Sequence, residues 1–161
     1  MGYRHATLTF HSEKDTARFA AVLGNLLRPG DTVLLDGDIG AGKTFLARAL
    51  IQSLQDQPED VPSPTFTLVQ TYDTRAGEIW HSDLYRISGT DEIEELGLLD
   101  AFETAICLVE WPDRLGGDIP ADALLVRLEA DATRMDERRV SLSWHSGSWG
   151  NRLSDLQKAA S

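Results

Sequence analysis

Residues 37–44 read GDIGAGKT and match the pattern G-x-x-x-x-G-K-T of a phosphate-binding loop. In such a loop, backbone N–H groups of a glycine-rich turn point at the phosphates, and the following helix adds its N-terminal dipole. Lys43 would reach the β- and γ-phosphates, and the Thr44 hydroxyl would coordinate Mg²⁺. The pattern predicts ATP or GTP binding. The predicted nucleotide-binding residues are Gly37, Asp38, Ile39, Gly40, Ala41, Gly42, Lys43, Thr44 and Phe45.

The sequence on either side of this loop has the context that the motif requires. Residues 32–35, Thr-Val-Leu-Leu, follow the turn at residues 28–31 and are typical of a buried strand. Leu46, Leu50 and Leu54 recur at helical spacing, so a helix should begin near Lys43. The alternative is a glycine-rich turn with an incidental lysine.

Glu110 is the first candidate for the acid that a Mg²⁺-dependent site needs beside the loop. It ends the apolar run at residues 106–109, and ligands of parallel sheets gather at the carboxyl ends of the strands. The alternative interpretation is a glutamate that merely opens a loop before Pro112.

Asp83 follows the strand-like residues 78–82 and is a candidate for orienting water or binding a metal-bound water. Aspartate is also common wherever a strand turns into a loop, which is the alternative here. His81 alternates onto the same face as Asp83 if the strand extends that far. A lone histidine is more often a packed residue than a base, so we do not assign it a catalytic role.

Thr65 lies in the segment Ser-Pro-Thr-Phe at residues 63–66, after the polar loop at residues 56–64. A threonine there is a candidate for a switch-like catalytic element that closes over the γ-phosphate and Mg²⁺. The alternative is a proline turn that starts the next strand.

These positions need a scaffold, and length and composition predict a single domain. The chain has 161 residues and is 42% hydrophobic, enough for one full core and too short for two ordinary ones. We expect residues 1–150 to form one P-loop NTPase domain and residues 151–161 a short C-terminal helix or tail.

The predicted fold is a three-layer α/β domain with a mixed, mostly parallel sheet and an antiparallel hairpin. Helices are expected after Ser12, near Lys43, at residues 91–96 and after Asn151. Residues 73–77 would connect the two hairpin strands. The predicted strands lie at residues 7–10, 32–35, 67–72, 78–82, 105–109, 123–128 and 139–144.

Charge and composition restrict the partners. Fifteen Lys and Arg against 26 Asp and Glu give a formal charge of −11, which disfavours extensive direct contact with tRNA or other nucleic acids. The single cysteine, Cys107, lies in an apolar run and is expected to pack in the core. The first residues lack a signal segment and no stretch approaches ~18 apolar residues, so we expect a cytoplasmic protein without membrane contact.

Five motifs together resemble the TsaE family, also called YjeE, the small ATPase of bacterial tRNA threonylcarbamoyladenosine synthesis. They cover the middle of the chain, about residues 30 to 115, in the order of the family. The loop alone is generic, whereas the downstream motifs are far more specific. The motifs are GDIGAGKT (37–44), VPSPTFTLV (61–69), HSDLYR (81–86), ELGLLD (95–100) and ICLVEWP (106–112).

The resemblance implies roles for matching positions. Thr44 and Glu110 would be the Mg²⁺-associated residues, and Lys43 would be a phosphate ligand. Asp83 would be an acid required for turnover, and Thr65 would be part of a switch-like element. Further candidates are Trp111 as a reporter of nucleotide or partner binding, and Glu13, Thr16 and Arg139 on the adenine side.

The resemblance also implies a function: an ATPase that binds a complex of the TsaD and TsaB proteins and resets it between turnovers. tRNA would then be contacted only indirectly, through these partners. One alternative is a nucleotide-dependent binding module with incidental hydrolysis. Another is a small-molecule kinase, although residues 90–103 contain no arginine for a lid. A GTPase is disfavoured because no N-K-x-D motif occurs.

Overall fold

The computed structural model describes residues 3–38, 40–62, 68–131, 133–134, 137–149, 152–153 and 156. The strands are β1 (Tyr3–Phe10), β2 (Thr32–Gly37), β3 (Val69–Thr74), β4 (Gly77–Asp83), β5 (Ile106–Glu110), β6 (Leu124–Ala130) and β7 (Arg138–His145). The helices are α1 (Glu13–Leu26), α2 (Lys43–Ser53), α3 (Thr90–Glu95), α4 (Leu98–Thr104), the 3-10 helix η1 (Pro112–Asp118) and α5 (Ser146–Trp149).

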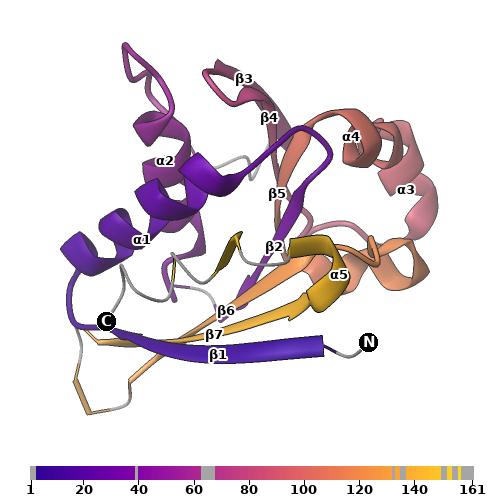
Figure 1. The fold of residues 1–161 in the computed structure, drawn as a ribbon. Helices are drawn as coiled ribbons and strands as arrows, with labels where there is room; N and C mark the ends of the chain where they lie inside the picture. The colour runs from indigo at the N-terminus through magenta and orange to yellow at the C-terminus, as the bar shows by residue number, and fades with distance from the viewer. Residues whose placement is uncertain are drawn as a thin grey trace.

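All strands join one seven-stranded sheet in the order β1-β7-β6-β2-β5-β4-β3. The central strands β6, β2, β5 and β4 are parallel. Strand β7 runs antiparallel to both β6 and β1, and β3 runs antiparallel to β4 (Figure 1). The predicted α/β fold, with a mixed, mostly parallel sheet and an antiparallel hairpin, is confirmed.

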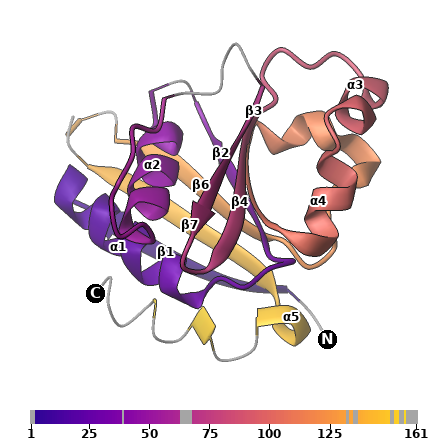
Figure 2. The same cartoon turned by 90° about the horizontal axis from the view of Figure 1, so that it is seen from above.

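Helices cover both faces of the sheet and make three layers. Helices α1 and α2 lie on one face, and α3, α4 and η1 lie on the other (Figures 1 and 2). The alternation of strand residues explains this, because Val33 and Leu35 join the cluster under α1 and α2 while Leu34 joins the cluster under α3 and α4. In the same way, Leu108 and Val109 of β5 face opposite layers.

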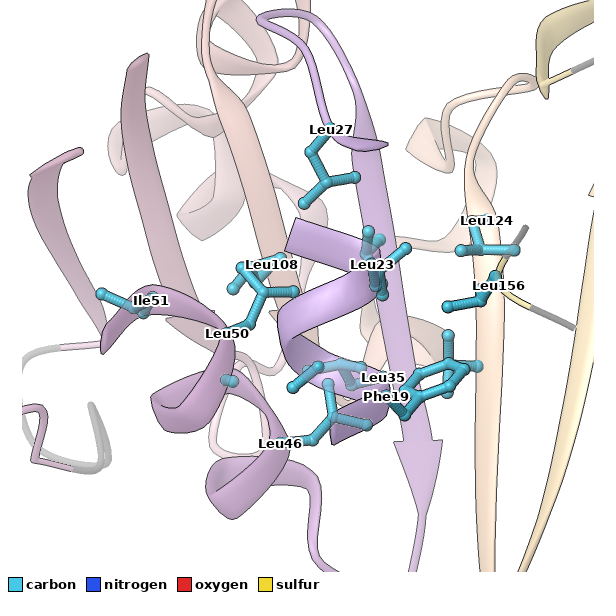
Figure 3. Packing of buried hydrophobic residues seen from close by; sticks show 14 of the residues in the cluster. Phe19, Leu23, Leu27, Leu35, Leu46, Leu50, Ile51, Leu108, Leu124 and Leu156 are labelled. Carbon is cyan, nitrogen blue, oxygen red and sulfur yellow. The ribbon is translucent and has the colours of Figure 1, made fainter. Parts of the chain in front are cut away.

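The larger core cluster holds the phosphate-loop helix against the sheet. Leu46 and Leu50 of α2 meet Phe19 and Leu23 of α1 above Leu35 of β2, and all five side chains are at most 1% exposed (Figure 3). Burying one such side chain contributes about 1.5–3 kcal/mol. This packing fixes the start of α2 at the carboxyl end of β2.

One expectation about local structure was wrong, and two short helices were not predicted. The hairpin strands extend further than predicted, so only Arg75 and Ala76 connect them, in place of residues 73–77. Gly77 begins β4 with a φ of 123°, a value that suits the tight connection. Helix α4 and the 3-10 helix η1 were not predicted, because each is too short for apolar periodicity to stand out.

The C-terminal segment is helical where the structure describes it. Helix α5 begins at Ser146, before the predicted start, and Arg152, Leu153 and Leu156 are also helical. Both leucines are buried in the larger core cluster. The division of the chain at residue 150 stays a prediction.

Cys107 packs in the core as expected. Its side chain is fully buried, and burial raises the pKa of its thiol to about 12. Among the described residues, we find no helix with the length and apolar character needed to cross a bilayer.

Candidate functional site

The phosphate-binding loop joins the end of β2 to the start of α2. Gly37 has a φ of 145°, and a Cβ added there would collide with the carbonyl oxygen of Leu128. Gly40 and Gly42 also have positive φ values, 83° and 107°, and a Cβ at either position would meet no atom within 4 Å. The loop therefore requires glycine for its backbone and leaves open space beside it, as a phosphate cradle must. Ile39 lies outside the described residues.

Backbone hydrogen bonds and one arginine hold this loop in shape. The Ala41 N–H donates to the Asp38 carbonyl at 3.0 Å, and the Leu46 N–H donates to Gly42 at 2.9 Å, the first bond of α2. From β7, Arg138 donates its Nε–H to the Ala41 carbonyl at 3.1 Å. The N-terminus of α2 thus faces the loop, where its dipole favours an anion.

Lys43 is buried between the loop and an aromatic ring. Its Nζ donates to the Gly37 carbonyl and, at 3.4 Å, to the Asp38 carbonyl. The same nitrogen lies 3.8 Å from the centroid of the Trp111 ring, a cation–π contact. Burial lowers the pKa of Lys43, and the carboxylates of Glu110 and Asp36 oppose that shift.

The side chains of Thr44 and Glu110 meet directly. The Thr44 hydroxyl lies 2.9 Å from Oε1 and 3.1 Å from Oε2 of the Glu110 carboxylate. Glu110 is 2% exposed, and in the parallel register it stands beside Leu35 of β2 and Asp83 of β4. The carboxyl ends of β2, β4 and β5 therefore converge on the first turn of α2.

Asp83 occupies a different environment from its neighbour. It is 8% exposed, and its Oδ1 accepts the Tyr85 N–H at 3.0 Å. Burial raises the pKa of Asp83, the Tyr85 N–H lowers it, and the Glu110 carboxylate raises it further. Asp83 therefore holds a proton more readily than an ordinary aspartate.

His81 also belongs to this cluster, although the sequence analysis assigned it no role. Its Nε2 lies 2.7 Å from Glu110 Oε2, and its side chain is fully buried. The available signal was its alternation with Asp83 along β4, which places both side chains on the face that carries α2. Arg138 is a second residue of the site that the sequence did not reveal, because no motif signals its contact with the loop.

Trp111 lies between the buried lysine and the surface. Its backbone adopts the left-handed conformation, with a φ of 60°, immediately after β5. Its ring is 4.8 Å from that of Tyr85, centroid to centroid, and Tyr85 is 44% exposed. Lys43, Trp111 and Tyr85 thus form a stack that reaches the surface.

The structure does not bring every predicted residue to the loop. Glu13 is exposed and Thr16 buried in the first turns of α1. Arg139 is exposed on β7, and its neighbour Arg138 makes the loop contact instead. Their adenine-side roles stay predictions. Phe45 is half-buried in the first turn of α2, and Thr65 lies outside the described residues.

The donor set at Thr44 and Glu110 fits Mg²⁺. This ion prefers hydroxyl and carboxylate oxygens, and it usually takes one or two protein ligands together with phosphates and water. Within the described part of the chain, no group of three or more His, Cys, Asp or Glu side chains is arranged to hold a metal.

Known proteins resemble this chain along most of its length. The TsaE family model, described as threonylcarbamoyl adenosine biosynthesis protein TsaE, matches residues 10–140. The tRNA threonylcarbamoyladenosine biosynthesis protein TsaE of Rickettsia felis is 36% identical over 153 residues, 95% of this chain and 87% of that protein. Its namesake from Aquifex aeolicus is 40% identical, covering 81% of this chain and 90% of that protein. A crystal structure of YdiB from Bacillus subtilis shares the fold, with a TM-score of 0.76, 23% identity and coverage of 98% and 97%.

Proposed function

This chain belongs to the TsaE family of threonylcarbamoyl adenosine biosynthesis proteins, and from that premise we propose that it is a Mg²⁺-dependent ATPase. In this proposal, ATP hydrolysis supports threonylcarbamoyladenosine modification of tRNA through a complex of the TsaD and TsaB proteins. Because the pathway acts on tRNA, the proposal places the chain in the cytoplasm.

One observation carries the proposal: the Thr44 hydroxyl lies within 3.1 Å of both Glu110 oxygens, one residue after the buried Lys43. This is the arrangement in which a phosphate loop, its lysine and an acid from a neighbouring strand serve one nucleotide. Thr44 and Glu110 would hold Mg²⁺, which neutralises phosphate charge when bound. Lys43 would bind the β- and γ-phosphates.

Asp83 supplies the remaining chemical group in the proposal. A buried carboxylate with a raised pKa suits a residue that orients the attacking water or accepts its proton. Its position beside Glu110 in the parallel register keeps it at the same edge of the sheet as the loop.

The charge of the chain supports the part of the proposal that concerns partners. A formal charge of −11 disfavours direct contact with the phosphate backbone of tRNA. A chain of this charge acts in a tRNA pathway most simply through proteins that hold the tRNA themselves.

ATPase assays of the purified chain, alone and with TsaD and TsaB, test the proposal. Nucleotide binding is measured in parallel, together with tRNA modification by the complete set of proteins. Lys43→Ala should lose nucleotide binding and turnover. Glu110→Gln should keep nucleotide binding in EDTA, weaken it in Mg²⁺, and lose about 100-fold or more in turnover, the scale expected when charge stabilisation is removed. Glu94→Ala, an exposed substitution on α3, is the matched control.

Two outcomes would contradict the proposal. Normal hydrolysis by Lys43→Ala would refute the assignment of the site. Full tRNA modification by a Glu110→Gln variant that binds ATP without hydrolysing it would favour a nucleotide-dependent binding module instead.

A further inference from the structure

We propose that His81 is a positioning residue that fixes the Glu110 carboxylate for the nucleotide site. The inference deepens the proposed function and rests on it. It assigns a role in that site to a buried histidine that was given none on the sequence alone.

The Glu110 carboxylate is held from two directions. Oε2 lies 2.7 Å from Nε2 of His81, which comes from the neighbouring strand β4. Oε1 lies 2.9 Å from the Thr44 hydroxyl of α2. The side chains of His81 and Glu110 are 0% and 3% exposed, so water does not compete for this pair.

The contacts determine which ring nitrogen carries the proton. A carboxylate only accepts, so the 2.7 Å contact requires a proton on Nε2. The other nitrogen, Nδ1, is buried and has no hydrogen-bond partner among the described residues. A proton on Nδ1 would bury an unpaired donor, so the contacts select the Nε2–H tautomer.

The two hydrogen-bond donors of Glu110, His81 and Thr44, belong to different elements of the fold. Thr44 has one hydroxyl proton and lies in the first turn after the phosphate loop, where its oxygen is also the predicted Mg²⁺ ligand. His81 is anchored on β4, which is paired on both sides, with β3 and β5. The His81 Nε2–H therefore continues to donate to Glu110 even when the Thr44 hydroxyl binds another group. Outer partners of this kind orient metal-ligating carboxylates.

A pair of amide substitutions tests the role of this one N–H group. His81→Gln places an amide nitrogen near the position of Nε2, and His81→Asn places it near Nδ1, too far back to reach Glu110. Both variants are neutral and differ by one methylene. Ser82→Ala removes another buried polar group from β4, on the opposite sheet face, and serves as the control.

We expect His81→Asn to lower kcat by about 10–100-fold, the range found for lost outer-sphere partners. It should weaken ATP binding by a similar factor in Mg²⁺ and leave ATP binding unchanged in EDTA, both measured by calorimetry. His81→Gln should restore most of the loss, and Ser82→Ala should match wild type. A merely structural histidine would not produce this Mg²⁺-specific difference.

Long-range ¹H–¹⁵N spectra test the same contact without nucleotide. They should show His81 as the Nε2–H tautomer, with a signal that shifts in Glu110→Gln. The opposite tautomer, an unchanged signal, or a folded His81→Asn variant with wild-type Mg²⁺-dependent affinity would overturn the inference. Equal defects in the Gln and Asn variants would do so too. A wild-type chain that binds MgATP without hydrolysing it would overturn only the proposed function.

Discussion

Asp83 and Glu110 stand side by side at the ends of β4 and β5, yet their side chains have different hydrogen-bond partners. Glu110 has the Thr44 hydroxyl and the His81 ring as hydrogen-bond donors. Asp83 has the Tyr85 N–H, and burial disfavours its charge. Under the proposed function, these different environments would separate a charge-stabilising acid, Glu110, from a proton-accepting one, Asp83.

We predict that Asp83→Asn lowers ATP turnover and stabilises the fold at neutral pH. Because the pKa of Asp83 is raised by folding, its contribution to stability is complete below the usual pKa of about 4 and is lost as pH rises through the raised value. Asparagine keeps an oxygen that accepts the Tyr85 N–H, and because it does not ionise, the variant does not lose this stability as the pH rises. Turnover should fall about 100-fold or more, as for a lost acid–base group.

Urea unfolding at several pH values measures the stability part of this prediction. The free energy of unfolding of the variant should exceed that of wild type at pH 7, and this difference should shrink as the pH falls towards 4. A variant that is less stable than wild type at pH 7 would contradict the conclusion that burial of the ionised Asp83 carboxylate destabilises the fold.

Trp111 should report nucleotide binding through the lysine above its ring. The Lys43 Nζ is 3.8 Å from the ring centroid, so a nucleotide that engages Lys43 changes the field at the indole. We expect ATP to change the tryptophan emission, and Trp111→Phe to remove most of that change. Trp80→Phe, at another partly buried tryptophan on β4, is the control and should keep it. An unaltered response in Trp111→Phe would contradict the contact.

At the scale of elements, the loop depends on how closely β2 approaches β6. Gly37 pairs with Leu128 in the parallel register, and a side chain at Gly37 would meet the Leu128 carbonyl. We predict that Gly37→Ala destabilises the fold by about 1–3 kcal/mol, the cost of a backbone conformation reserved for glycine. Gly117→Ala, where an added Cβ meets open space, should change stability by less than about 0.5 kcal/mol. Equal unfolding midpoints in urea for the two variants would refute this account.

The sequence predicted those elements whose signals are local. The loop at residues 37–44, the strand before it and the helix after it follow from a motif and from apolar spacing within one segment. The end of β5 was found in the same way, since an unbroken apolar run precedes Glu110.

The sequence did not reveal the contacts that depend on register between distant strands. The His81–Glu110 pair requires β4 and β5 to be neighbours, and the Arg138–Ala41 contact requires β7 to reach the loop. A single residue of slip would send each of these side chains to the other face. Helix α4 follows Gly97, whose φ of 78° breaks the chain direction, and it has too few residues for a periodic pattern.

At the scale of the whole molecule, the C-terminal segment is attached to the end of α1, to the turn before β2 and to the turn before β6. Arg152 forms a salt bridge with Asp31 at 2.8 Å and donates to the Leu26 carbonyl at 2.9 Å. The Trp149 indole N–H donates to the Asp122 carbonyl at 2.7 Å. The segment thereby closes the core beneath α1, the helix that packs against the phosphate-loop helix α2.

This arrangement predicts that Leu156 contributes to global stability although it lies near the end of the chain. Its side chain is 0% exposed and packs with the cluster that includes Phe19 and Leu124 (Figure 3). Leu156→Ala should cost about 2–5 kcal/mol of unfolding free energy in urea, because it removes buried methyl groups and leaves a cavity. Ile119→Ala, at a site that is 44% exposed, is the aliphatic control and should cost less than about 0.5 kcal/mol. Equal urea unfolding midpoints for the two variants would show that the C-terminal segment contributes nothing to the stability of the domain. Since the same core supports α2, Leu156→Ala should also lower the temperature at which nucleotide binding is lost.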